Sequence, residues 1–250
     1  YSSAASDVYK RQGLACLLAV ALTACAGGGE PPAPSGSPAS APLEALKEPA
    51  NSMSVSPPLS PAPVSAEALA AYRALLAGEP GALDRPPEGL ELHQVTLPPA
   101  EELEYVLLDL DGDGGAELVV QMVAQPHQFN AVFHYGDGEL SCWQYDIMEM
   151  SCRDYPLGDG AMVRQYDTGT GPNRYSNLYT VFRYLPDGET EECASLAVHQ
   201  DTQEDGTEVF TYLVDDAEVD QDTFAAEFEE LVGSRLLSLE DWTPATERPG

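Results

Sequence analysis

Basic residues are scarce in this chain. It has 11 lysines and arginines against 42 aspartates and glutamates, a formal net charge of −31 over 250 residues. Nucleic-acid binding requires clustered basic side chains that displace counterions from phosphates, and electrostatic adhesion to anionic lipid headgroups requires the same clusters. The composition therefore argues against both kinds of partner. It favours a solvating surface that attracts cations.

Long apolar runs are also missing. The longest, residues 13–21, is too short to cross a bilayer core of about 30 Å, which needs about 20 apolar residues. The run follows Lys10 and Arg11 and precedes a small-residue stretch around Cys25. A basic segment, a short apolar run and small residues at a cleavage site are typical of an export signal, not of a membrane-spanning helix.

Leu22-Thr23-Ala24-Cys25 resembles the bacterial lipobox. The resemblance implies that the Cys25 thiol carries a diacylglycerol and that residues 1–25 form the signal region. We then expect a lipid anchor on the outer face of the bacterial cytoplasmic membrane or on the cell surface. An ordinary signal peptide with an incidental cysteine is the alternative. Because the chain starts at Tyr1 and not at Met, we expect its first dozen residues to be non-native, so that the apolar run and the lipobox alone carry this prediction.

Cysteine is used sparingly, with five in the chain. Apart from Cys16 and Cys25 there remain Cys142, Cys152 and Cys193, and no Cys-x-x-Cys pair occurs, which argues against structural zinc. Outside the cytoplasm one disulfide is plausible, and Cys142 with Cys152 is the candidate pair because they are closest in sequence. The other pairings, and three unpaired thiols, stay open.

Signatures of catalysis are absent as well. Neither G-x-S-x-G nor H-E-x-x-H occurs, and the four histidines are scattered along the chain. Paired carboxylates are uninformative among 42 acidic residues. The glycine-rich segment 167–175 has the wrong spacing for a phosphate-binding loop, so we expect it to be a surface loop.

The composition divides the chain at about residue 63. Residues 26–63 are rich in Gly, Pro, Ser and Ala, which predicts a disordered linker between the lipid and the folded part. Residues 64–250 are expected to form a single globular domain. Its first element is a helix that Ser65 caps and Gly78 ends, and its last is a helix from Thr223 to about Val232 that Asp222 caps.

Between these helices the pattern changes to that of strands. Asp-Gly pairs recur at residues 137, 159, 187 and 205, several of them between segments of alternating hydrophobicity, which is typical of hairpins. The fold class that follows is α+β, an antiparallel sheet built from successive hairpins with one helix before it and one after it. The predicted strands are residues 105–108, 117–123, 131–134, 140–145, 178–185, 194–199 and 209–214.

The segment 109–118, Asp-Leu-Asp-Gly-Asp-Gly-Gly-Ala-Glu-Leu, is the one specific motif. Asp109, Asp111 and Asp113 place three carboxylates at alternate positions, and the glycines between them allow the backbone to turn inward. The Gly115 carbonyl and the Glu117 carboxylate can add further oxygens. A Ca²⁺ ion takes six to eight such oxygens.

The motif resembles the short calcium loops of FG-GAP and VCBS-type repeats. Its wider context, a tyrosine before a strand, the loop and then an apolar strand, resembles that of uncharacterised bacterial lipoproteins with the same loop. The resemblance covers the loop and its two flanking strands, and it implies that Asp109, Asp111, Asp113, Gly115 and Glu117 are Ca²⁺ ligands. The chain departs from those families in having a single loop, which argues against a propeller. A turn that aspartates cap without metal is the alternative.

Three functions remain compatible with the sequence. The first is a lipid-anchored, non-enzymatic module with a structural calcium site and an unidentified extracellular ligand. The second is an accessory extracellular hydrolase acting on wall or nutrient polymers. The third is a structural or scaffolding lipoprotein.

Overall fold

The computed structural model describes residues 62–124, 129–147, 151–171 and 173–249. The chain separates into two units, Tyr1–Ser54 and Val55–Gly250, and every described residue belongs to the second. The signal region, the lipobox with Cys25 and nearly all of the expected linker lie outside the described residues. Within the described residues, neither helix has the length and hydropathy needed to cross a membrane.

The first helix, α2 (Ala66–Leu76), confirms its prediction. The Ser65 side chain accepts a hydrogen bond from the Ala68 N–H at 3.0 Å, which satisfies a donor that the helix itself cannot pair. Ala68, Tyr72, Leu75 and Leu76 are the buried side chains of the helix. Their spacing of three and four residues places them on one face, and that face packs on the sheet beneath.

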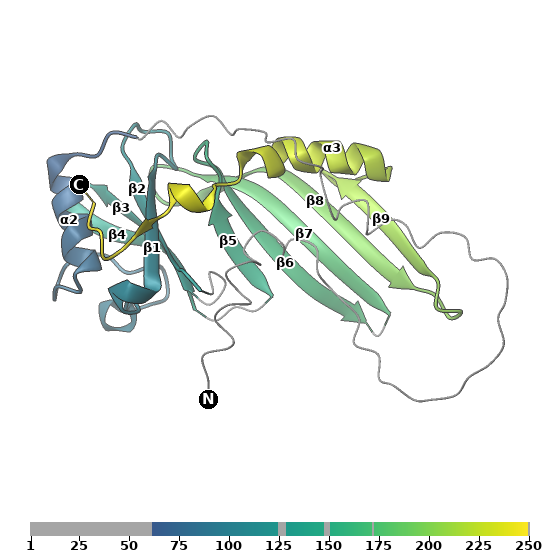
Figure 1. Ribbon diagram of the computed structural model, residues 1–250, viewed down its shortest axis with the longest axis horizontal. Helices are drawn as coiled ribbons and strands as arrows, with labels where there is room; N and C mark the ends of the chain where they lie inside the picture. Colours follow the sequence, from purple (N-terminus) through teal and green to yellow (C-terminus); the bar gives the residue numbers. More distant parts are fainter. Residues whose placement is uncertain (1–61, 125–128, 148–150, 172, 250) are drawn as a thin grey trace. The chain divides into compact units, whose positions relative to one another are not determined.

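The strands form two sheets, and all strand pairs within them are antiparallel (Figure 1). The first sheet has the order β11-β1-β2-β3-β4, and the second has the order β10-β9-β8-β7-β6-β5. The strands of the first are β1 (Leu103–Leu108), β2 (Glu117–Met122), β3 (Phe129–Gly136), β4 (Glu139–Ile147) and β11 (Thr243–Pro244). Those of the second are β5 (Cys152–Pro156), β6 (Met162–Gly171), β7 (Arg174–Tyr184), β8 (Thr190–Thr202), β9 (Glu208–Val214) and β10 (Ala217–Val219).

The last helix, α3 (Gln221–Leu231), contacts β8 and β9 of the second sheet (Figure 1). Its N-cap is Asp220, whose carboxylate accepts the Thr223 N–H at 2.8 Å, so the predicted cap at Asp222 was two residues too late. Short 3₁₀ turns complete the secondary structure at η1 (Leu92–Gln94), η2 (Ala100–Glu102), η4 (Gly233–Arg235) and η5 (Leu239–Asp241). The α+β class, the hairpin order and the two flanking helices are therefore confirmed.

The sequence did not predict how the strands divide into two sheets. The segment 167–175, expected to be a surface loop, instead joins β6 to β7 as the end of a hairpin, with Asp167 opposite Asn177 and Thr168 opposite Ser176. These strand ends carry polar side chains on both faces, so they lack the alternation that marks a half-buried strand. Cross-strand pairing outweighs the weak strand preference of the glycines here.

Apolar and polar contacts join the two sheets. Val106, Leu108 and Val119 of the first sheet share a buried cluster with Met162 and Phe182 of the second. Beside it a polar chain crosses the same boundary. Tyr184 donates to the side-chain Oε1 of Gln144 at 2.6 Å, Nε2 of Gln144 donates to Oδ1 of Asn130 at 3.0 Å, and Asn130 donates to the backbone carbonyl of Asp154 at 2.6 Å. These polar side chains pair with one another by hydrogen bonds. The pairing stabilises the contact between the two sheets and also fixes how they pack.

The expected disulfide between Cys142 and Cys152 is not formed. Cys142 is a free, buried thiol on β4 of the first sheet, with its sulfur 3.1 Å from the Gln144 carbonyl, whereas Cys152 begins β5 of the second sheet. Burial raises the pKa of Cys142 to about 12. The chain changes sheet between the two cysteines, so their closeness in sequence does not bring their sulfur atoms together.

Candidate metal centre

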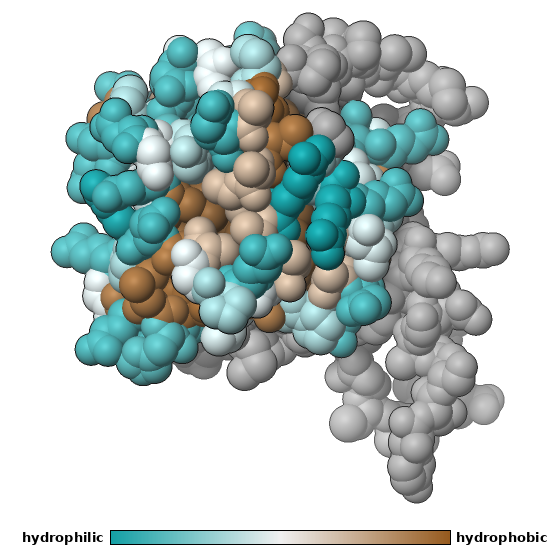
Figure 2. Space-filling view, turned by 90° about the vertical axis from the view of Figure 1, so that its left-hand side faces the viewer, coloured by the Kyte–Doolittle hydropathy of each residue, from teal (hydrophilic) through white to brown (hydrophobic). Residues whose placement is uncertain are grey.

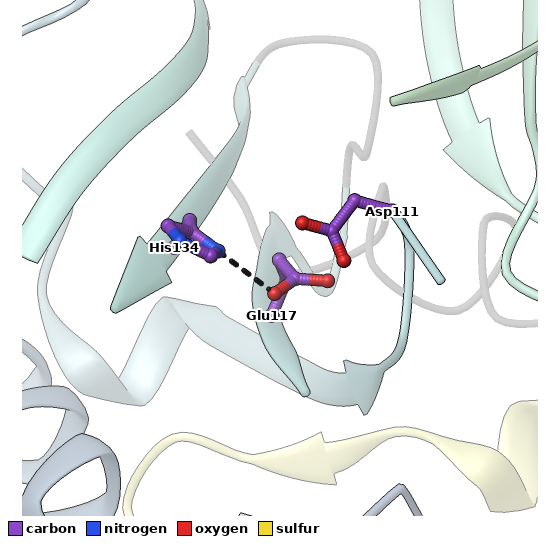
Figure 3. Close-up of side chains that lie close together, drawn as sticks. All are labelled: Asp111, Glu117 and His134. Carbon is purple, nitrogen blue, oxygen red and sulfur yellow. Dashed lines mark hydrogen bonds and ion pairs between the residues drawn. The ribbon is translucent and has the colours of Figure 1, made fainter. Parts of the chain in front are cut away.

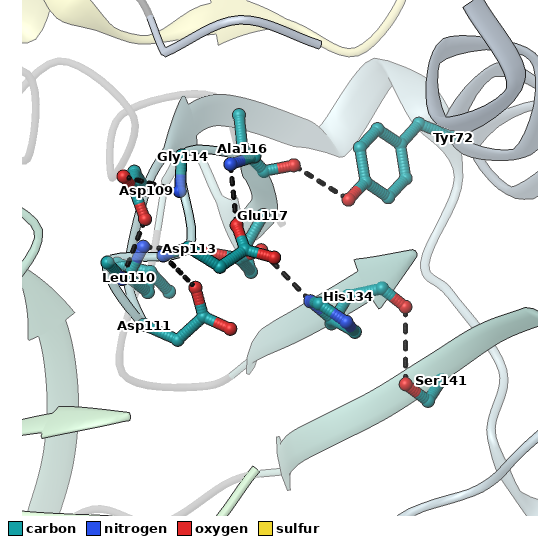
Figure 4. Close-up of polar contacts among 12 residues, drawn as sticks. Tyr72, Asp109, Leu110, Asp111, Asp113, Gly114, Ala116, Glu117, His134 and Ser141 are labelled. Atoms are coloured by element: carbon teal, nitrogen blue, oxygen red, sulfur yellow. Dashed lines mark hydrogen bonds and ion pairs between the residues drawn. The ribbon is translucent and has the colours of Figure 1, made fainter. Parts of the chain in front are cut away.

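The predicted calcium loop connects β1 to β2. Gly112 and Gly114 have φ values of +78° and +89°, and this left-handed backbone lets the chain fold back on itself. Two backbone N–H groups then point at one carboxylate: Gly112 donates to Asp109 at 2.7 Å and Gly114 donates to the other oxygen of Asp109 at 3.1 Å. The Gly115 N–H donates to Asp113 at 2.5 Å. The loop thus holds its carboxylates in fixed orientations (Figure 4).

Three of the five predicted ligands lie together. Asp109, Asp111 and Asp113 each offer a carboxylate oxygen, and these atoms all lie within 4.8 Å of one another. Asp111 Oδ1 accepts the Asp113 N–H at 3.0 Å. Asp111 Oδ2 is buried and has no hydrogen-bond partner within the described part of the chain. A buried carboxylate oxygen without a partner carries a desolvation penalty that a bound cation would remove.

Glu117, the fourth carboxylate, is the most deeply buried, with 1% of its surface exposed. It begins β2, and its Oε2 accepts the Leu110 N–H at 2.7 Å. Its Oε1 lies 3.0 Å from Nδ1 of His134, so Glu117 groups with Asp111 and His134 (Figure 3). The fifth predicted ligand, the Gly115 carbonyl, remains a prediction.

His134 is the residue at this site that sequence reasoning missed. It lies on β3, one position beyond Phe133, which pairs with Leu118 of β2. That register sets His134 opposite Glu117, a relation that requires knowledge of which strands pair. The ring stacks on Trp143, with the centroids 4.3 Å apart and an interplanar angle of 12°.

Burial governs the electrostatics of the group. Burial raises the pKa of Glu117, although its hydrogen bonds with His134 and Leu110 oppose the shift. Burial also raises the pKa of Asp111, and the neighbouring Asp113 carboxylate adds to that rise. For His134 burial favours the neutral ring, but the hydrogen bond and charge of Glu117 outweigh it and raise the pKa of the imidazole. Each shift opposes the accumulation of negative charge.

Arginine does not supply the missing positive charge. Within the described residues, the arginine ion pairs are made with Glu139, Asp154, Asp159 and Asp201, and none is made with a carboxylate of the loop. The only two lysines, Lys10 and Lys47, lie outside these residues. Among the described residues, the four carboxylates therefore have His134 as their one titratable cationic neighbour.

Two neighbours brace the loop from outside. The Tyr72 hydroxyl of α2 donates to the Ala116 carbonyl at 2.8 Å (Figure 4). From the second sheet, the turn between β5 and β6 brings Gly160 so close that a Cβ there would lie 2.1 Å from the Asp109 carbonyl oxygen. In that turn Asp159 accepts hydrogen bonds from Arg183 at 2.9 Å and from Arg235 at 2.6 Å. The loop is thus in contact with the first helix and with both sheets.

A second histidine also has a partner that the sequence did not indicate. His199 of β8 and Ser176 of β7 are cross-strand neighbours, and the Ser176 hydroxyl lies 2.7 Å from Nδ1 of the ring. Ser176 is 2% exposed. We treat the contact as a cross-strand hydrogen bond, because neither residue belongs to a recognised nucleophile motif.

Comparison with known proteins adds no family to this description. No family model matches the chain, and neither a curated protein nor a solved structure is significantly similar to it.

Proposed function

We propose that the folded part of this chain is a calcium-binding, non-enzymatic module that a lipid on Cys25 holds at the outer face of a bacterial membrane. One observation supports the calcium site above all. Four carboxylates converge on a loop with no lysine or arginine among their described partners, and one buried oxygen of Asp111 is left without a hydrogen bond. A divalent cation would neutralise this charge and occupy that oxygen.

The donor chemistry fits Ca²⁺. The groups at the loop are hard oxygen donors, and Asp109, Asp111 and Asp113 are close enough to share one ion. Gly115 and Glu117 complete the proposed ligand set. The ion would tie the loop to β1 and β2, and through Tyr72 and Gly160 to α2 and the second sheet, so its proposed role is structural.

Thermal unfolding of the full chain tests the calcium site. We compare EDTA with about 1 mM Ca²⁺, at which a site with a Kd of about 0.1 mM would add roughly 1.4 kcal/mol to the free energy of unfolding. The expected rise in Tm is about 3 °C. The same concentration of Mg²⁺ controls for ionic strength.

Two variants make that test specific. Asp111→Asn keeps the shape of the side chain but removes a proposed ligand, so the Ca²⁺ response should disappear. Asp205→Asn is the matched control, because Asp205 accepts a turn N–H from Thr207 at 2.9 Å, as the loop aspartates do, but lies outside the site. A wild-type Tm that does not respond to Ca²⁺ would mean that the loop is a turn capped by its own aspartates.

The lipid anchor has a separate test. Its support is the sequence alone, the apolar run of residues 13–21 followed by the lipobox that ends at Cys25. Expressed in a bacterium, the chain should incorporate labelled fatty acid and partition into a detergent phase. Cys25→Ser should abolish both, whereas Cys16→Ser should abolish neither. Labelling that survives Cys25→Ser would contradict the anchor.

A further inference from the structure

We propose that Asp111, Glu117 and His134 form a second cation position, beside the aspartate loop, that takes a first-row transition ion such as Zn²⁺ or Mn²⁺. It rests on the proposed calcium function only in that both positions use Asp111 and Glu117. The three side chains come from different places in the chain: the loop, the start of β2, and β3 (Figure 3). Their ligand atoms all lie within 4.8 Å of one another.

The imidazole is held in the orientation that such an ion needs. Nδ1 of His134 faces Glu117 at 3.0 Å. Nε2 faces Gly136, where an added Cβ would lie only 2.4 Å away, so the ring packs against bare backbone on that side. Trp143 stacks on the ring at a centroid distance of 4.3 Å. The ring is thus packed by its neighbours, and the nitrogen that points inward is Nδ1.

The carboxylates of Glu117 and Asp111 can each offer an oxygen to this ion. The side chain of Glu117 is 2% exposed and is oriented by the Leu110 N–H on its Oε2, while Oε1 points towards His134. Asp111 contributes Oδ2, the buried oxygen without a partner among the described residues. This orphaned oxygen points to a ligand independently of the acidic composition of the loop.

The donor set differs in kind from that of the aspartates. Ca²⁺ binds oxygen, whereas Zn²⁺ and Mn²⁺ accept imidazole nitrogen together with carboxylate oxygen. Three protein ligands leave at least one coordination position for water or a further ligand. The arrangement therefore assigns the nitrogen-containing position to a transition ion and the aspartates to calcium.

Tryptophan fluorescence can report on this position. The chain has two tryptophans, Trp143 and Trp242, so Trp242→Phe leaves Trp143, stacked on His134, as the one reporter. We would titrate the full-length Trp242→Phe chain with Zn²⁺ twice, once with enough Ca²⁺ to saturate the proposed calcium site and once without Ca²⁺. Zn²⁺ should change the Trp143 emission in both buffers.

Four variants in this background locate the ion. His134→Gln should weaken Zn²⁺ binding by at least about tenfold, since even the loss of an outer-shell partner costs 10- to 100-fold, and should keep the Ca²⁺ response. Asp109→Asn should lose the Ca²⁺ response and keep Zn²⁺ binding. Asp111→Asn should impair both Zn²⁺ binding and the Ca²⁺ response. His93→Gln, which alters an exposed histidine 3.2 Å from Glu91, is the matched control and should change neither. Zn²⁺ binding that is lost in Asp109→Asn but kept in His134→Gln would overturn the second position.

A measurement on the unsubstituted chain covers the case in which His134→Gln fails to fold. Mn²⁺ bound through an imidazole shows nitrogen hyperfine coupling in pulsed electron paramagnetic resonance. Coupling from one nitrogen supports the proposal, and bound Mn²⁺ without nitrogen coupling overturns it. If Ca²⁺ has no effect on the wild type but the nitrogen coupling is present, the calcium function fails while this inference stands.

Discussion

Glu117 is the carboxylate at the loop that most needs a cation. Burial raises the pKa of this carboxylate and the charge of Asp111 adds to the rise, while His134 and the Leu110 N–H oppose it. A charged group in such a place is tolerated when a cation pairs with it. The geometry that makes Glu117 costly without a cation is what makes it suitable as a ligand.

These shifts predict a pH dependence. In Ca²⁺-free protein the raised pKa values of Glu117, Asp111 and His134 mean that the folded state binds their protons more tightly than the unfolded state. Their contribution to the free energy of unfolding is therefore present below the unfolded pKa values and is lost as pH rises through the folded ones. Ca²⁺ requires the ionised carboxylates, so its stabilising effect should grow over the same range.

The measurement is the difference in Tm between Ca²⁺ and EDTA at pH 5 and at pH 8. We expect the larger difference at pH 8. Glu117→Gln should lose the Ca²⁺ effect and should also flatten the fall in EDTA stability between the two pH values. A Ca²⁺ effect of equal size at both pH values would contradict the assignment of buried carboxylates as ligands.

Tyr72 provides a second prediction at a single residue. Its hydroxyl donates to the Ala116 carbonyl, and its side chain has no exposed surface. Tyr72→Phe leaves that buried carbonyl unpaired, which should lower the free energy of unfolding by about 1–3 kcal/mol. Urea denaturation measures it. Tyr145→Phe is the control, since its hydrogen bond to the Thr96 carbonyl at 2.8 Å is exposed, and it should cost less than about 1 kcal/mol. Equal losses would show that the Tyr72 contact does not brace the loop.

Elements with a local cause could be predicted from the sequence. The cap at Ser65 and the apolar spacing of α2 are both local, and so is the Asp-x-Asp-Gly-Asp-Gly spacing that places three aspartates together. Features that depend on which strands pair, and in which register, could not be predicted. His134 joins the site through the register of β2 with β3, and the β6–β7 hairpin forms from segments with little hydrophobic alternation. The chain also changes sheet after β4, which separates Cys142 from Cys152.

The turn between β5 and β6 tests whether the second sheet supports the loop. Gly160 has a φ of +83° and lies against the Asp109 carbonyl. Gly160→Ala adds both backbone strain and a steric clash, so we expect a loss of more than about 2 kcal/mol and a weaker Ca²⁺ response. Gly206→Ala is a close control, because Gly206 has a φ of +84° but open space around its Cα, and only the strain of about 1 kcal/mol should remain. If the two variants unfold alike, the approach of Gly160 to Asp109 is not a support of the loop.

At the scale of the whole molecule, charge and apolar surface coexist. Figure 2 shows the side of the molecule that carries α2, where small and apolar residues form a band between hydrophilic ones. The exposed and half-buried positions of α2 include Ala66, Ala70 and Ala74, so this helix offers little charge to solvent. Exposed acidic residues cluster elsewhere, in segments such as Asp187–Glu192 and Asp215–Asp222. Mutual repulsion among those exposed carboxylates opposes the folded state.

A net charge of −31 should therefore make the stability of the Ca²⁺-free chain depend on monovalent salt. At physiological ionic strength, interactions between exposed charges more than about 8 Å apart are largely screened. Raising NaCl from about 20 mM to about 300 mM should raise Tm by a few degrees, on the order of 1 kcal/mol. Glu191→Gln with Glu192→Gln, which removes two exposed charges from β8, should reduce that salt response, and KCl should act as NaCl does.

Asp111→Asn should retain the salt response while losing the Ca²⁺ response, because screening acts on the whole surface and the ion acts at one site. If Asp111→Asn kept both responses, the effect attributed to Ca²⁺ would be general screening, and the loop would not be a specific site.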